Sequence, residues 1–239
     1  MEQHKQIPFH AVIASENRRA LNFVLMANDI VADTKRWNVP RECEVARTPE
    51  SLAAVVERLV HHGDHIIFVD KLFDPGVKTP RWREILCAFI ALVTYRDGRP
   101  PVLEYHTMMD ESAFSAASDQ GRQEIQEHFE SWLADNLPSG VEITVFLWSE
   151  DFARKRVHAR CVLTERGGMR IDAGLDRVTD DHMTDVMLMD DTLYAQRWSM
   201  LCEASDLFRN DRSRFLAESE RKGWVHAAVI KGKDERSHE

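Results

Sequence analysis

Three side chains in one short stretch have the types and the spacing to handle a phosphate group: His158, Arg160 and Glu165. Side chains alternate along a strand, so His158 and Arg160 would lie on one face. A guanidinium grips phosphate oxygens in pairs, and a neutral imidazole can act as nucleophile or acid/base near neutral pH. A following carboxylate can orient the imidazole. We therefore expect His158, Arg160 and Glu165 to be catalytic. The alternative is a structural histidine beside a surface ion pair.

A basic cluster, Arg154, Lys155 and Arg156, comes directly before this stretch. Such a cluster is a candidate for contacting a polyanion backbone, although a solvated loop is the other interpretation. The formal net charge of the chain is −9. Any contact with nucleic acid must therefore come from a local patch and not from the overall field.

Four residues elsewhere are candidates for binding. Asp70 follows an apolar run, at the end of a strand where open α/β sheets place ligands. Glu104 and His106 would share one strand face and could line a pocket beside His158, and Asp176 could organise the site. The alternatives are a turn aspartate at Asp70, two solvated side chains at Glu104 and His106, and a capped turn at Asp176.

Helical and strand patterns alternate along the chain, which predicts an α/β fold with a mixed β-sheet flanked by helices on both faces. Thr48 and Pro49 have the types of an N-cap and a first helical residue. The apolar run 66–69 fits a strand buried on both faces. The pattern predicts further helices at residues 82–93, 120–136 and 192–208, and further strands at 102–107, 141–147, 157–164, 169–171 and 186–189.

We expect one large domain at residues 48–231, preceded by a helical extension at 1–47 and followed by a frayed, charged tail at 232–239. The extension is expected to contain a helix within residues 17–37. The four cysteines form no CxxC pair, which argues against a zinc site and against a disulfide framework. No metal and no cofactor is expected. No apolar run reaches the roughly 18 residues of a membrane helix, and the N-terminus lacks a secretory signal. A cytoplasmic protein is the simple interpretation.

The segment 158–176 (HARCVLTERGGMRIDAGLD) resembles the motif of the phospholipase D-like superfamily, in which His-x-Lys is followed after four residues by Asp. It is still more similar to a subgroup that carries His-Asp-Arg, a glycine pair and Gly-Leu-Asp. That subgroup includes uncharacterised bacterial proteins and the C-terminal module of eukaryotic MIT-domain proteins. The run 66–75 (IIFVDKLFDP) resembles a strand and turn of the same fold. The resemblance spans residues 50–200.

The resemblance implies a metal-independent phosphodiesterase, with His158 forming a phosphohistidine, Arg160 in place of the lysine and Glu165 in place of the aspartate. Enzymes of this fold need two motifs, and this chain has one, so activity implies a homodimer. A nuclease of a bacterial defence or mobile-element system is the function expected. The alternative is a catalytically silent module that binds a protein partner encoded in the same operon, a nucleic acid or a phospholipid headgroup. The two substitutions, the single motif and the acidic charge favour that alternative.

Overall fold

A computed structural model describes residues 12–14, 24–26, 41–71, 81–95, 98–108, 119–149, 153, 160–176, 178, 182–211, 213–215 and 224–232 of the chain. His158 and the basic cluster 154–156 lie outside these residues. The chain divides into two compact units, residues 1–41 and residues 42–239. In the smaller unit, β1 (Val12–Ala14) pairs in parallel with β2 (Val24–Met26). The helix expected there is therefore wrong at residues 24–26, because three adjacent apolar residues fit a short strand as well as a helical face.

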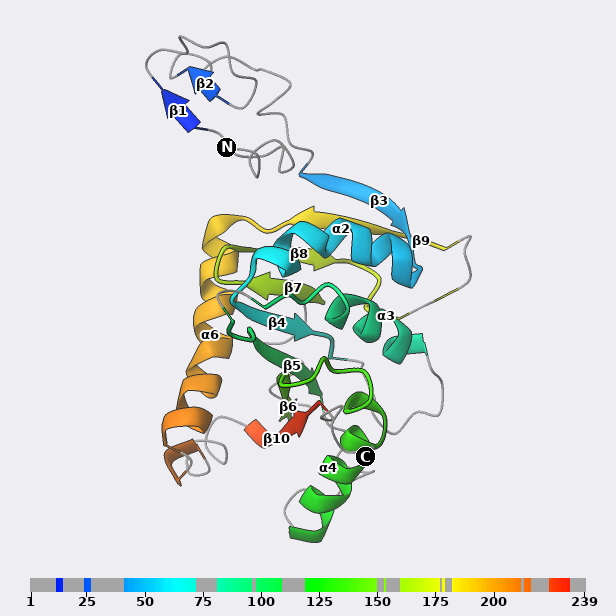
Figure 1. The fold of residues 1–239 in the computed structure, drawn as a ribbon, viewed down its shortest axis with the longest axis vertical. Helices are drawn as coiled ribbons and strands as arrows, with labels where there is room; N and C mark the ends of the chain where they lie inside the picture. The colour runs from blue at the N-terminus through cyan, green and yellow to red at the C-terminus, as the bar shows by residue number, and fades with distance from the viewer. Residues whose placement is uncertain are drawn as a thin grey trace. The chain divides into compact units, whose positions relative to one another are not determined.

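The larger unit is built on an eight-stranded sheet with the order β10-β6-β5-β4-β7-β8-β9-β3 (Figure 1). Strands β4, β5 and β6 are parallel, and the other neighbours are antiparallel, so the sheet is mixed as expected. The strands are β3 (Glu42–Ala46), β4 (His65–Val69), β5 (Val102–Met108), β6 (Glu142–Trp148), β7 (Cys161–Thr164), β8 (Gly167–Ile171), β9 (Met183–Leu188) and β10 (Trp224–Lys231). The helices are α2 (Pro49–His62), α3 (Arg81–Ile90), α4 (Asp119–Leu133) and α6 (Asp191–Asn210).

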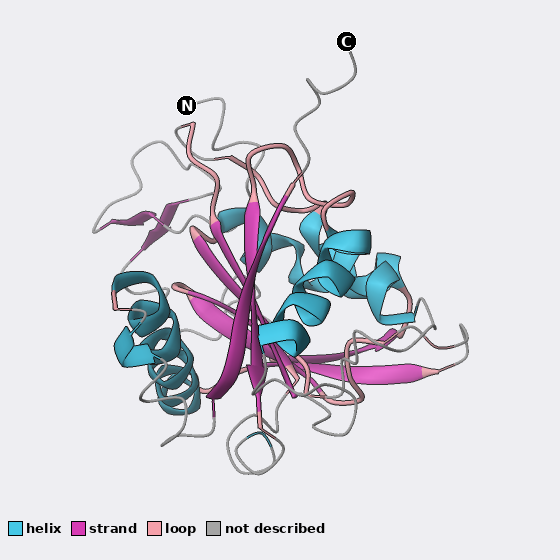
Figure 2. Cartoon of the chain, turned by 90° about the horizontal axis from the view of Figure 1, so that it is seen from below, coloured by secondary structure: helices cyan, strands magenta, loops and turns pink. Residues whose placement is uncertain are grey.

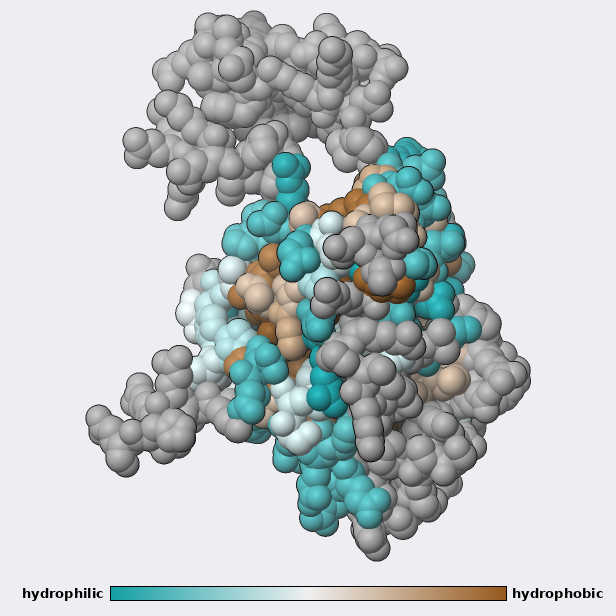
Figure 3. Space-filling view, turned by 90° about the vertical axis from the view of Figure 1, so that its right-hand side faces the viewer, coloured by the Kyte–Doolittle hydropathy of each residue, from teal (hydrophilic) through white to brown (hydrophobic). Residues whose placement is uncertain are grey.

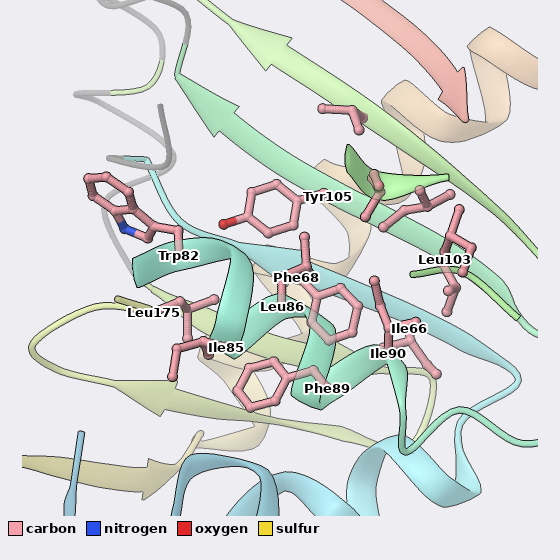
Figure 4. Close-up of a cluster of buried hydrophobic side chains, with 14 of the residues drawn as sticks. Ile66, Phe68, Trp82, Ile85, Leu86, Phe89, Ile90, Leu103, Tyr105 and Leu175 are labelled. Carbon is pink, nitrogen blue, oxygen red and sulfur yellow. The ribbon is translucent and has the colours of Figure 1, made fainter. Parts of the chain in front are cut away.

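The two faces of the sheet carry separate apolar cores, because successive side chains of a strand point to opposite faces. On β4, Ile66 and Phe68 join a core with α2, α3 and α4, whereas Ile67 and Val69 join a core with α6. Figure 4 shows the first of these cores around α3, and Figure 2 shows helices on either side of the strands. The expectation of helices on both faces is confirmed.

Helix α2 begins as its sequence predicts. The Thr48 hydroxyl accepts a hydrogen bond from the Ser51 backbone N–H at 3.2 Å, and Pro49 occupies the first turn. The helix closes at Gly63, where a Cβ atom would come within 2.7 Å of the Thr164 methyl group. Because Gly63 has no Cβ, the chain can pass close to the Thr164 side chain of β7 as it leaves α2 and enters β4.

Two strands at the edges of the sheet were not expected. β3 pairs with β9, so residues 42–46 belong to the sheet, and the boundary of the larger unit lies at Glu42 and not after Arg47. Its sequence, ECEVA, shows little apolar alternation because the strand is exposed over its first half. β10 pairs with β6, and Gly232 still donates to the Val141 carbonyl at 3.0 Å. The rest of the expected tail lies outside the described residues.

In the described part of the chain, no helix is both long enough and apolar enough to span a membrane. Hydrophilic and apolar residues are interleaved on the face shown in Figure 3. The large apolar side chains with the highest exposure among the described residues are Tyr95, Met183, Leu188 and Leu193.

Candidate functional site

Asp70 and Arg160 face each other at the carboxyl end of β4. The antiparallel register of β4 and β7 pairs Val69 with Cys161, which brings the next residue of each strand end together. The Asp70 side chain is 1% exposed, and its Oδ1 lies 3.8 Å from the Arg160 Nε. The Asp70 backbone N–H also donates to the His106 carbonyl at 3.1 Å. A guanidinium and a buried carboxylate therefore meet at the strand ends where α/β sheets place ligands.

The loop after β8 closes over this pair. The Leu175 backbone N–H donates to the Asp70 Oδ2 at 2.8 Å, and the Arg160 Nη1 donates to the Asp172 carbonyl at 3.0 Å. Gly174 between them has a φ of 109°, and a Cβ there would lie 3.3 Å from the Arg160 Nε. Only glycine fits this conformation and this space without strain. Leu175 itself enters the apolar core near Ile85 (Figure 4).

Arg47, which the sequence analysis did not select, holds the end of the same loop. Its Nη2 donates to the Ala173 carbonyl at 3.1 Å and forms an ion pair with the Asp176 carboxylate. The pair joins residues 129 positions apart, and nothing in the local sequence around Arg47 signals it. We call Arg47, Asp70, Arg160 and Asp176 the edge cluster. Its two guanidiniums and two carboxylates balance in charge.

The edge cluster also acts on Tyr105, whose side chain is buried on the same face of the sheet. Burial first, and then the carboxylates of Asp70 and Asp176, raise the pKa of the Tyr105 phenol well above its ordinary value. The phenol therefore stays neutral near these carboxylates at physiological pH. The structure thus brings together three of the sequence-predicted residues, Asp70, Arg160 and Asp176.

Glu165 does not join them. Its Oε2 accepts hydrogen bonds from the backbone N–H groups of Asp64 at 3.0 Å and His65 at 3.1 Å, at the opposite end of β4. β7 stays extended from Arg160 to Thr164, and a strand rises by about 3.3 Å per residue, so Glu165 lies roughly 16 Å further along. The surface ion pair between Arg160 and Glu165, which was the alternative, is wrong for this reason, whereas the expected role of Glu165 toward His158 stays a prediction, because His158 lies outside the described residues.

Glu104 and His106 lie on the other face of β5, under α6, and both are 0% exposed. The Glu104 Oε1 accepts from the His65 Nε2 at 2.8 Å and from the Arg209 Nη2, and its Oε2 accepts from the His106 Nε2 at 3.1 Å and from the Ser205 hydroxyl. We call these five residues, together with Trp148, the hub. The alternative of two solvated side chains at Glu104 and His106 is therefore wrong, whereas a pocket beside His158 stays a prediction, because His158 lies outside the described residues.

The hub holds Glu104 ionised and His106 neutral. Burial opposes ionisation of Glu104, but hydrogen bonds from His106 and His65 outweigh burial, and its pKa lies well below the ordinary value. Burial lowers the pKa of His106, although its hydrogen bond to Glu104 opposes that shift. All the strong acceptor positions of the Glu104 carboxylate are used, which satisfies the buried charge.

His158 and the basic cluster 154–156 lie outside the described residues, so the geometry around them stays a prediction. Among the residues that the structure does describe, no group of three or more His, Cys, Asp and Glu side chains is arranged to hold a metal ion.

No family model matches the chain, and no curated protein sequence matches it. One solved structure that the fold resembles is that of TrmBL2, an archaeal chromatin protein described as showing a novel mode of DNA binding. The TM-score is 0.31 at 11% sequence identity, over 74% of this chain and 56% of that protein. The chain thus spans little more than half the length of that protein, and a likeness of this size carries no argument about fold or function.

Proposed function

We propose that this chain is a phospholipase D-like module that binds a phosphodiester at the carboxyl ends of β4 and β5, with Arg160 as the side chain that contacts the phosphate. The observation that carries the proposal is the convergence of Asp70, Arg160 and Asp176 from distant parts of the sequence. A planar guanidinium at a strand end is suited to bind two phosphate oxygens at once.

The short distance along the sequence between the basic cluster and Arg160 supports a larger cationic surface at this edge. Residue 156 is four peptide steps from Arg160, which limits their Cα separation to about 14 Å. Arg154, Lys155 and Arg156 are therefore within reach of a polyanion whose phosphate contacts Arg160. The basic cluster adds three positive charges within six residues of Arg160 in the sequence, whereas the charges of the edge cluster cancel, so a local positive field is compatible with an acidic chain.

Binding without hydrolysis is the form that the geometry favours. Arg160 already holds the loop through the Asp172 carbonyl and pairs with Asp70, and Glu165 is at the far end of β7. A guanidinium that organises its own loop is suited to hold a phosphate in one place. The carboxylate to which the resemblance assigns a catalytic role does not lie beside Arg160.

The test is binding of fluorescently labelled 20-nucleotide single-stranded DNA, single-stranded RNA and duplex DNA, and of vesicles that contain phosphatidylserine. Anisotropy and co-sedimentation are measured from 50 to 200 mM salt. We expect binding of at least one probe. For a nucleic acid, the salt slope should be shallower by about 0.7–0.9 for each phosphate that an Arg154→Ala, Lys155→Ala, Arg156→Ala variant no longer neutralises. The probe that binds identifies the source of the phosphodiester.

The matched control removes three cations elsewhere: Arg58, Arg166 and Lys231, each replaced by alanine. This variant changes the net charge equally and is expected to keep the wild-type salt slope. A folded wild-type chain that binds none of the probes at 50 mM salt would contradict the proposed function. An equal loss in both triple variants would assign any binding to overall charge and not to this edge.

Hydrolysis is the second candidate function, and Asp70 is the observation that favours it. A buried carboxylate stands beside Arg160, where it could orient the His158 imidazole in the role expected of Glu165. A His158 nitrogen would attack phosphorus, the bond to the leaving oxygen would break, and water would then cleave the phosphohistidine. The test is cleavage of the same nucleic acids in EDTA, with acid-labile, base-stable phosphohistidine trapped on His158. Cleavage that persists in His158→Ala, or an absence of both signals, excludes it.

A further inference from the structure

We propose that the hub is a pH-sensitive latch, which holds the C-terminal half of α6 on the sheet at neutral pH and releases it on mild acidification through protonation of His106. This device is independent of the proposed phosphodiester site, because it lies on the opposite face of β4 and β5.

The first step is that the C-terminal half of α6 bonds to one buried carboxylate of the sheet, beside the apolar contacts of Leu201 and Ala204. Two polar side chains of its C-terminal half, Ser205 and Arg209, bond to the Glu104 carboxylate. Ser205 is fully buried, so its bond to Glu104 cannot be replaced by water while the helix stays docked. Any change that weakens Glu104 as an acceptor, or moves it, therefore acts directly on α6.

The second step is that the neighbours of His106 fix its tautomer. The Trp148 indole N–H has no acceptor capacity, and it donates to the His106 Nδ1 at 3.1 Å. Nδ1 must therefore carry no proton, and the proton of the neutral ring lies on Nε2, which donates to Glu104. Protonation at Nδ1 would set two N–H donors against each other in a water-free site. The His106 ring cannot move aside freely, because it stacks on Phe146 with the ring centroids 4.6 Å apart.

The third step concerns the other groups around His106. Glu104 on β5 and His65 on β4 are the titratable groups that act on the His106 ring, and Arg209 and Cys202 of α6 lie around Glu104. His65 lies on the β4 side of Glu104, with its Nε2 2.8 Å from the Glu104 Oε1. Burial raises the pKa of the Cys202 thiol to about 12, so this thiol does not titrate between pH 5 and 8.

The fourth step is the sign and size of the effect. The pKa of His106 is lowered in the folded chain from its ordinary value of 6.5. The neutral ring then contributes stability that is fully present above pH 6.5 and is lost as the pH falls toward the folded pKa. Between pH 7.5 and pH 5.5, opening of α6 should become more frequent, with an upper limit of about tenfold set by the ordinary pKa of 6.5. Glu104 acts in the same direction, but only as the pH falls below its ordinary value of 4.5.

The experiment is hydrogen–deuterium exchange of the full chain at pH 7.5 and pH 5.5, with protection factors corrected for the intrinsic exchange rates. We expect peptides from residues 201–210 to lose protection at the lower pH, by up to about tenfold. Peptides from α2 and α3, which pack on the other face, should lose little. An equal loss in all three helices would indicate global unfolding and would overturn the proposal, and so would the absence of any loss in α6.

Three histidine variants assign the group. His106→Gln keeps a donor toward Glu104 and cannot titrate. The loss of α6 protection between pH 7.5 and pH 5.5, here called the pH step, should therefore vanish in this variant, whatever its protection at pH 7.5. His61→Gln, on the exposed end of α2, should keep the step, and His65→Gln should also keep it. If His106→Gln does not fold, Trp148→Phe replaces it, because removal of the indole N–H should shrink the step. A step that persists in the folded variant, or that vanishes in His65→Gln, would overturn the proposal.

Discussion

The edge cluster and the hub each place a buried carboxylate beside an arginine near the central strands β4 and β5, yet they do different work. Asp70 ends β4 and Glu104 lies within β5, and the alternation of side chains sends them to opposite faces of the sheet. At the edge, arginines that are 13% and 22% exposed hold a loop beside solvent. In the hub, a carboxylate that is 0% exposed holds a helix. Asp70 is as buried as Glu104, at 1% exposure, so the two regions differ in what their carboxylates hold and not in the burial of those carboxylates.

The largest effect should follow from breaking the hub. Glu104→Ala leaves Arg209, His65 and Ser205 without their shared acceptor, and removal of one partner from a buried pair costs about 3–5 kcal/mol. Arg209 is 36% exposed and can regain water, so we expect the lower end, about 3 kcal/mol in the free energy of unfolding. Urea denaturation measures it. Glu104→Gln keeps the shape and should cost less. A loss below about 1 kcal/mol in Glu104→Ala would mean that α6 docks through its apolar face alone.

The sequence could predict the elements that repeat a local pattern, but not the pairs that the fold creates. α2 follows from Thr48, Pro49 and its apolar face, and β4 follows from its apolar run. β3 was missed because an exposed edge strand needs no apolar alternation. Asp70 was selected as a site residue for its place at a strand end, which is itself a local property.

Long-range pairs had no such local signal. Arg47 meets Asp176 only because β3 and β9 pair, and Glu104 meets Arg209 only because α6 crosses β5. The spacing between Arg160 and Glu165 was correctly read from the sequence. Their separation in space was not, because it depends on β7 staying extended up to Thr164.

The edge cluster should respond less strongly than the hub. Asp70→Asn keeps an acceptor for the Leu175 N–H but removes the charge that faces Arg160, and we expect a loss of about 1–3 kcal/mol. Thermal and urea unfolding measure it. The matched control is Asp172→Asn, whose side chain is 60% exposed and pairs with Arg170 at the surface, with an expected change of about 0.5 kcal/mol or less. Equal losses in the two variants would mean that the buried pair adds nothing.

A substitution at Gly174 tests whether the loop after β8 must keep its backbone conformation for the edge cluster to form. Gly174→Ala combines a φ of 109° with a Cβ placed 3.0 Å from the Asp176 Oδ1, and we expect a loss of about 2 kcal/mol together with weaker phosphodiester binding. Gly98→Ala is the matched control, because Gly98 also has a positive φ, 74°, but a Cβ there meets nothing within 4 Å. It should cost about 1 kcal/mol and leave binding unchanged. Equal effects of the two substitutions on binding would mean that the conformation of the loop at Gly174 does not matter for the ligand.

Glu165→Gln should have the smallest effect on stability. It tests most directly whether Asp70 or Glu165 belongs to the ligand site. The amide oxygen can still accept from the backbone N–H groups of Asp64 and His65, and the lost ion pair with Arg166 is exposed, so we expect a loss of about 0.5–1 kcal/mol. Binding of the phosphodiester probe should equal that of the wild type, whereas Asp70→Asn should change it, because Asp70 and not Glu165 faces Arg160. A tenfold loss of affinity in Glu165→Gln, without a matching loss of stability, would return Glu165 to the ligand site. It would require the strand end near Asp64 to contact the same ligand as Arg160, roughly 16 Å away.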